Sequence, residues 1–118
     1  MLNLVRFRER ANYPDGREAT GAEAYRAYAA ASAPVFAHVG GTQHWIGRFE
    51  LTVIGPPDER WDAVFIAQYP SGAAFVEMLR DPVYRDAVVH RQAAVETSRL
   101  IRLEPRTPGD AFGTTETA

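Results

Sequence analysis

Residues 61–86 constrain the fold of this chain more than any other stretch, because an expected strand runs there directly into two helix starts. Residues 61–69 place apolar side chains on both sides of that strand, which is typical of a central strand. Pro70 ends it, Ser71 is a good helix cap, and Asp81 precedes a proline that suits a first helical position. A strand followed at once by helices is half of a repeated unit, so we expect the rest of the chain to supply the other half.

The first half of the chain completes this unit. Thr20 and Glu23 have the spacing of a capping box, and Gly40 follows the last residue of a helical pattern. Pro34 lies inside that pattern and removes a backbone donor, so we expect the helix to kink or restart near Ala33. In chain order we expect a strand over residues 1–8, a mobile loop over 9–19, a helix over 20–39, a strand over 42–54, a loop over 55–60, a strand over 61–69, helices starting after Ser71 and Asp81, and a strand over 97–104.

Right-handed connections between these elements give an α+β, ferredoxin-like βαββαβ fold. Its one four-stranded antiparallel sheet has the first and third strands at the centre and the helices on one face. The apolar side chains on the other face stay exposed unless something packs on them. We expect a second copy to cover this open face, which makes a homodimer. The alternative is a monomer whose open face is covered by its own C-terminal tail.

Length and charge limit the class of protein. A chain of 118 residues is one domain, which we place at residues 1–104, and residues 105–118 are expected to be a disordered tail. A net charge of −2 gives no reason to expect a nucleic-acid partner. Apolar runs are shorter than the roughly 20 residues that a bilayer requires, and no targeting segment is recognisable. We therefore expect no membrane association and a cytoplasmic location.

Two missing residue types exclude several chemistries. The chain has no Cys, which excludes thiolate nucleophiles, disulfides and sulfur ligands for metals. All 13 basic residues are Arg, so no lysine can form a Schiff base or hold a nucleotide phosphate.

Four segments carry a resemblance to a known family. They read NLVRFR, TGAEAYRAYAAASAPVFAHVGG, WDAVFIAQYPS and DPVYRDAVVHRQAAVETSRLI, and the resemblance covers residues 1–104. They resemble a small bacterial family known as domain of unknown function thirteen-thirty. That family belongs to the dimeric α+β barrel group, whose other members include cofactor-free antibiotic-biosynthesis monooxygenases, haem-degrading enzymes, muconolactone isomerase and chlorite dismutase. The resemblance implies a dimeric α+β barrel, but no catalytic residue, because those enzymes do unrelated chemistry and none of their motifs matches here.

Metal binding is the first chemistry to consider. His38, His44 and His90 are the only imidazoles, and no two of them have the spacing that points both at one ion. We therefore expect no metal site and no cofactor. His38 is expected to be a favourable charge near a helix C-terminus, His44 to lie on the wetter face of its strand, and His90 on a helix surface. The resemblance to the group leaves a haem-ligating His90 as the alternative.

Arg91 is the strongest single candidate for a functional residue, because it shares an inward helical stripe with Tyr84. In one interpretation, Arg91 pairs with Asp62 or Glu96, or its stem covers apolar surface while its head reaches water. In the other, it anchors a carboxylate or enolate in a cavity between helices and sheet, and Arg6 faces the same cavity.

Tyrosines are the second group, because buried hydroxyls need partners. Tyrosines around Arg91 would line an apolar pocket with a few directed donors, the usual character of a small-molecule site. The candidate ligand-binding residues are Arg91, Tyr84, Tyr25, Tyr28, Arg6, His38, His44 and Trp61.

The sequence leaves three functions open and the catalytic residues unknown. The first is a small-molecule-binding dimer with cofactor-independent, monooxygenase- or isomerase-like activity on a partly apolar or aromatic ligand. Such catalysis would need a base, for which His38, His44 and Asp62 are the candidates. The second is a ligand-sensing module without catalysis, and the third is a purely structural dimer.

Overall fold

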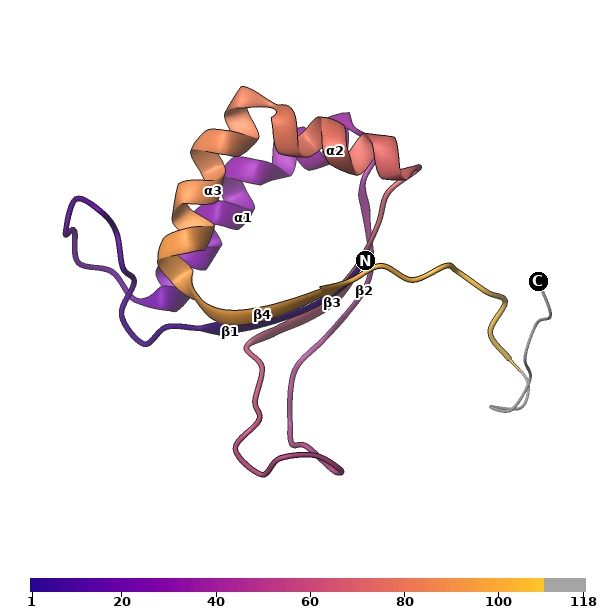
Figure 1. The fold of residues 1–118 in the computed structure, drawn as a ribbon, viewed down its shortest axis with the longest axis horizontal. Helices are drawn as coiled ribbons and strands as arrows, with labels where there is room; N and C mark the ends of the chain where they lie inside the picture. Colours follow the sequence, from indigo (N-terminus) through magenta and orange to yellow (C-terminus); the bar gives the residue numbers. More distant parts are fainter. Residues whose placement is uncertain (110–118) are drawn as a thin grey trace.

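The structure, a computed structural model, describes residues 1–109. Four strands form one antiparallel sheet in the order β2-β3-β1-β4, and three helices lie on one side of it (Figure 1). The predicted ferredoxin-like fold, with the first and third strands at the centre, is confirmed. The elements are β1 (Leu2–Phe7), α1 (Gly21–His38), β2 (Thr42–Gly47), β3 (Ala63–Gln68), α2 (Gly72–Arg80), α3 (Pro82–Ala94) and β4 (Val95–Ile101).

The two faces of the sheet have different surroundings. Phe7 of β1 packs on Tyr25 of α1 with ring centroids 4.8 Å apart, so the odd-numbered side chains of β1 face the helices. Val5 on that side is only 1% exposed. The even-numbered side chains of β1 and their cross-strand partners project from the other side, which we call the open face. Its apolar members are Leu2, Leu4, Trp45, Val64, Ile66 and Ile101.

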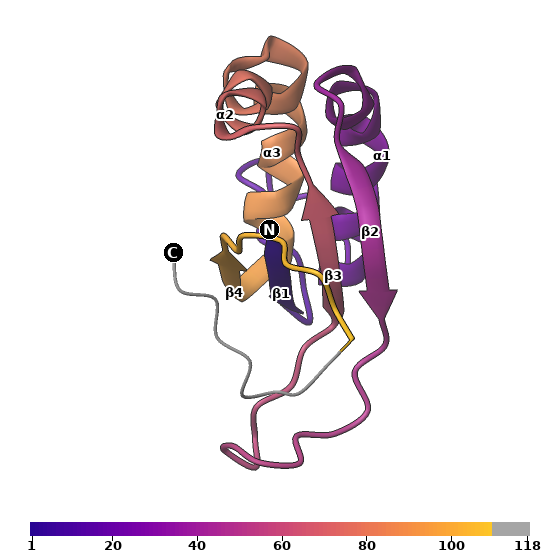
Figure 2. The same cartoon turned by 90° about the vertical axis from the view of Figure 1, so that its right-hand side faces the viewer.

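The predicted helix starts are confirmed by their caps. Glu23 N donates to Thr20 Oγ1 at 3.0 Å, and Thr20 N donates to Glu23 Oε1 at 2.9 Å, which is a reciprocal capping box. The side chains of Ser71 and Asp81 accept backbone hydrogen bonds at the starts of α2 and α3. α1 and α3 then lie side by side over the sheet (Figure 2).

We expected α1 to kink or restart near Ala33, and the restart is wrong. Pro34 lies inside one continuous helix. Proline removes the hydrogen bond to the carbonyl of Ala30, and both Pro34 and Ala30 are exposed. Because water can reach the freed carbonyl there, the helix tolerates the proline.

Three strand limits also differ from the prediction. β2 ends at Gly47 rather than at residue 54, and β3 begins at Ala63 rather than at residue 61. Gly47 pairs with Val64, so pairing of residues 48–54 would need residues 57–63 extended, but a turn joins Glu59 N to Pro56 O at the far end of that segment. β4 covers Val95–Ile101 rather than residues 97–104, because its partner β1 begins opposite Ile101.

The loop over residues 9–19 is held more firmly than the prediction of a mobile loop implies. Tyr13 in this loop is buried, and its hydroxyl lies 2.6 Å from Nδ1 of His90 on α3. Asn12 N donates to the carbonyl of Ala93, which ties the loop backbone to the same helix. His90 is thus a partner of this loop rather than a free surface histidine. The predicted tail begins in the exposed residues 105–109, and its remainder lies outside the described residues.

Candidate functional site

Three tyrosines and one arginine meet between the two long helices and the sheet. Tyr25 and Tyr28 lie one turn apart on α1, and Tyr84 and Arg91 lie two turns apart on α3, so each pair shares a helix face. The hydroxyls of Tyr28 and Tyr84 are 2.8 Å apart, and the rings of Tyr25 and Tyr28 have centroids 5.5 Å apart. We call these four residues the tyrosine cluster. The sequence predicted all four as candidates, and the structure brings them together.

Arg91 has no carboxylate partner in the described chain. Its Nη2 donates to Ser98 Oγ at 3.4 Å, and no carboxylate of residues 1–109 lies within 4.0 Å of it. Of the two partners considered for it, Asp62 accepts a hydrogen bond from Phe7 N at 2.7 Å, and Glu96 pairs with Arg6. The half-buried guanidinium therefore has no acid of the described residues beside it, and its charge acts on Tyr25 and Tyr28.

Burial keeps the hydroxyls of Tyr25 and Tyr28 protonated at neutral pH. Burial raises the pKa of Tyr25 and that of Tyr28, and the hydrogen bond with Tyr84 raises the pKa of Tyr28 further. The positive charge of Arg91 opposes these increases without cancelling them. At neutral pH these side chains are thus hydrogen-bonding groups rather than bases.

The other four candidate residues lie outside the cluster. Arg6 is on the open face, where its Nε lies 3.3 Å from Glu96 Oε2, so the idea that it shares a cavity with Arg91 is wrong. Its β1 neighbours Val5 and Phe7 face the helices, and strand alternation turns Arg6 the other way. Of the remaining three, His38 lies at the end of α1 and His44 lies in a β-bulge of β2. Trp61 lies just before β3.

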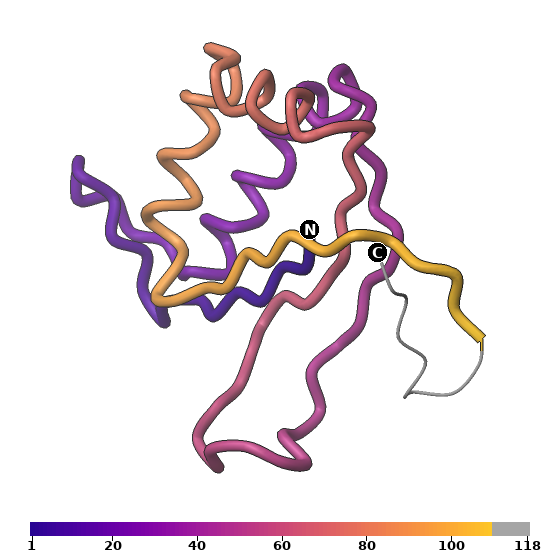
Figure 3. The backbone as a smooth tube through the Cα atoms, turned by 45° about the vertical axis from the view of Figure 1, so that its right-hand side comes forward, coloured from indigo at the N-terminus to yellow at the C-terminus, as the bar shows by residue number. Residues whose placement is uncertain are grey.

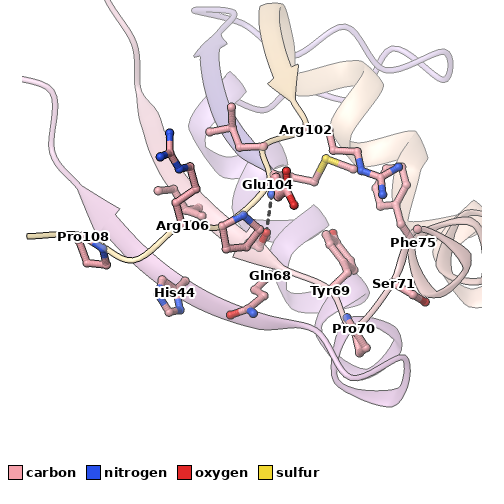
Figure 4. A pocket seen from close by; sticks show the side chains of 16 residues that line it. His44, Gln68, Tyr69, Pro70, Ser71, Phe75, Arg102, Glu104, Arg106 and Pro108 are labelled. Atoms are coloured by element: carbon pink, nitrogen blue, oxygen red, sulfur yellow. Dashed lines mark hydrogen bonds between the residues drawn. The ribbon is translucent and has the colours of Figure 1, made fainter. Parts of the chain in front are cut away.

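A cavity of about 830 Å³ opens at the far end of the sheet, beside the start of α2 (Figure 4). The side chains of Tyr69, Phe75 and Arg102 line it, and residues 103–106 and Pro108 border it. The ring of Tyr69 contacts Phe75 at a centroid distance of 5.2 Å. Burial, followed by the effects of Tyr84 and Tyr25, raises the pKa of Tyr69 to about 12. Tyr69 packs in the same hydrophobic cluster as Tyr28 and Tyr84, so it lies between the cavity and the tyrosine cluster. His44 is the only predicted candidate in its lining.

Sequence reasoning missed two features of this region. The Tyr13–His90 contact joins residues 77 positions apart, and Tyr13 lies in a segment without periodicity, so no local pattern marks it. Arg102 was assigned to the last strand, but it lies beyond β4 and borders the cavity.

The described residues contain no group of three His, Asp or Glu side chains able to hold a metal ion. Within residues 1–109, no helix is both long and apolar enough to cross a membrane.

The hydroxyl pair can be tested by a double-mutant cycle. Tyr28→Phe leaves the buried Tyr84 hydroxyl without its partner, and we expect it to lower the free energy of unfolding by about 1–2 kcal/mol. Tyr28→Phe with Tyr84→Phe should cost less than the sum of the single changes, as measured by urea denaturation. Tyr25→Phe is the control, since its hydroxyl has no hydrogen-bond partner among the described residues. Additive effects of the two changes would contradict a direct hydrogen bond.

Stability should also depend on pH in the alkaline range. A pKa that is raised in the folded state contributes stability that is present below the unfolded value and is lost as pH rises through the folded value. For Tyr69 the window runs from 10.0 to about 12. We expect the free energy of unfolding to fall with a steeper slope in the native chain than in Tyr69→Phe. Tyrosine ionisation can be followed by absorbance during an alkaline titration. A single transition of all tyrosines with a midpoint at the ordinary pKa of 10.0 would contradict this prediction.

Comparison with known proteins places the chain among uncharacterised relatives. Residues 17–103 match the family model described as Domain of unknown function (DUF1330). The crystal structure of methylated RPA0582 protein has 70% sequence identity and a TM-score of 0.90, and the match covers 92% of this chain and 81% of that one. A second crystal structure, of the RPA0582 protein of unknown function from Rhodopseudomonas palustris, has 69% identity and a TM-score of 0.88, with coverages of 91% and 81%. No curated protein matches. The chain belongs to the family of the domain of unknown function DUF1330.

Proposed function

We propose that this protein binds a small, partly apolar or aromatic ligand with a negative charge at the tyrosine cluster. The observation that carries the proposal is Arg91, a half-buried guanidinium whose charge acts on Tyr25 and Tyr28 and which has no carboxylate within ion-pairing distance in residues 1–109. A ligand carboxylate or enolate would supply the missing charge. The rings of Tyr25 and Phe7 would pack on its apolar part.

The cluster supports binding better than catalysis. Cofactor-independent oxygenation or isomerisation requires a base next to the reacting carbon. Burial raises the pKa of the Tyr28 hydroxyl, which makes it a poor base at neutral pH. His38 and His44 are exposed and lie away from the tyrosine cluster, and His90 is hydrogen-bonded to Tyr13. We therefore favour a ligand-binding or sensing protein over a monooxygenase- or isomerase-like enzyme.

We also propose that the protein forms a homodimer through the open face. The apolar side chains of that face lie next to one another across the sheet, and Trp45 is 53% exposed and Ile101 is 41% exposed. Apolar surface left in water costs about 25 cal/mol per Å². A second copy placed sheet to sheet removes this cost for both chains by one self-complementary contact. A purely structural dimer remains the alternative function, and the role of Arg91 distinguishes the two.

Ligand binding can be tested with simple aromatic acids. We expect benzoate or a larger aromatic carboxylate to raise the melting temperature of the native chain, because the ligand binds only the folded state. Arg91→Ala should weaken that binding by about 10–100-fold, the loss expected for a hydrogen-bonded charge. Calorimetric titration gives the affinity directly.

Two controls separate charge recognition from general effects. Arg85→Ala removes an exposed arginine from the same helix and should leave the affinity unchanged. Benzamide has the shape of benzoate without its charge and should not bind. Equal affinity of the native and Arg91→Ala chains for the acids, or equal binding of benzoate and benzamide, would contradict the proposed site.

A further inference from the structure

Residues 48–62 form an arm that leaves the sheet between β2 and β3. The arm projects from the side of the sheet opposite the helices (Figures 1 and 3). It carries the most exposed large apolar side chains of the described residues: Leu51 is 65% exposed, Val53 is 85% exposed and Ile54 is 94% exposed. Apolar side chains gathered on one projecting segment mark an interaction surface.

The arm has internal hydrogen bonds that define its shape. Thr52 Oγ1 donates to the carbonyl of Glu59 at 2.9 Å, which joins its two limbs near the tip. Glu59 N donates to the carbonyl of Pro56 at 3.1 Å, which closes the turn. At its base, Asp62 Oδ2 accepts from Phe7 N. The apolar side chains are thus presented on a folded segment rather than on a loose loop.

We infer that this arm packs against the flank of a second copy of the chain, an inference that rests on the proposed homodimer. Seven residues, 48–54, lead from β2 to the turn, and at about 3.3 Å per residue they reach roughly 20 Å. Two sheets packed face to face lie about 10 Å apart. An arm that projects from the open face is therefore long enough to reach past the sheet of a second copy packed on that face. It then lies along the side of that second sheet.

The arm carries four acids and two arginines, a net charge of −2, and the open face carries arginines of opposite sign. The arm carries Glu50 and Asp58, neither of which forms an ion pair within the described residues. The open face carries Arg6, whose Nε is buried without a hydrogen-bond partner although Glu96 lies 3.3 Å away, and the neighbouring Arg99. In the dimer, the acids of each arm lie toward the arginines on the sheet of the other chain. The twofold symmetry axis makes this contact occur twice. The arm and the open face are consequently parts of one continuous interface.

The experiment measures the dimer dissociation constant of the full chain. Val53→Asp with Ile54→Asp should raise it at least about tenfold, because the change places charges in an apolar contact. The matched control, Val83→Asp with Val89→Asp, alters two apolar residues of α3 that are 52% and 40% exposed, and it should leave the constant unchanged.

A second measurement does not depend on a destabilising change. Because the chain has no Cys, Ile54→Cys can carry a single polarity-sensitive dye. Its emission should shift to the red when the protein is diluted below the dissociation constant, whereas a dye at Val83→Cys should not respond. A dimer whose arm variant keeps the native dissociation constant, with an unresponsive dye at residue 54, would overturn the arm contact and leave the open-face dimer standing. A native chain that is monomeric at every concentration would overturn both.

Discussion

The structure depends on one constraint: the two central strands carry apolar side chains on both faces, while the helices can cover only one. On the covered face, Val5 and Phe7 pack against the helix layer and fix which side of β1 looks inward. Antiparallel pairing then fixes the orientation of the remaining three strands, because residues that pair across a sheet point to the same face. The tyrosine cluster belongs to the covered side and the exposed apolar surface to the other, so the proposed ligand site and the proposed dimer contact are separated by the sheet.

This separation explains why the two arginines have different environments. Arg91 comes from a helix, bonds to Ser98 on the covered side of the sheet and acts electrostatically on Tyr25 and Tyr28, and no acid of the described residues compensates it. Arg6 comes from the central strand, points out of the open face and lies beside Glu96. The loop that carries Tyr13 is tied to α3 next to Arg91 through His90. Tyr25 packs against the hydrophobic cluster that contains Tyr13, so the tyrosine cluster lies beside this anchored loop.

Local signals allowed much of this fold to be predicted. Thr20 with Glu23, Ser71 and Asp81 mark helix starts because a cap acts over three residues, and the structure confirms each. The helical spacing of Tyr84 and Arg91 likewise predicted half of the cluster. Nonlocal features were missed: the alternation over residues 48–54 suggests a strand, but β2 ends at Gly47, and the facing segment, residues 57–63, begins in the turn that joins Glu59 to Pro56. The face of Arg6 could not be known, because both sides of its strand are apolar and periodicity does not tell which one meets the helices.

The central claim is that the open face is covered by a second copy, and sedimentation equilibrium of the full chain tests it most directly. Leu4 lies at the centre of that face opposite Val64, so Leu4→Asp would place a charge inside the contact without touching the helix layer. The account predicts twice the chain mass for the native protein at micromolar concentration and the single-chain mass for Leu4→Asp with its circular dichroism preserved. A native protein that sediments as one chain even at the highest soluble concentration would contradict it.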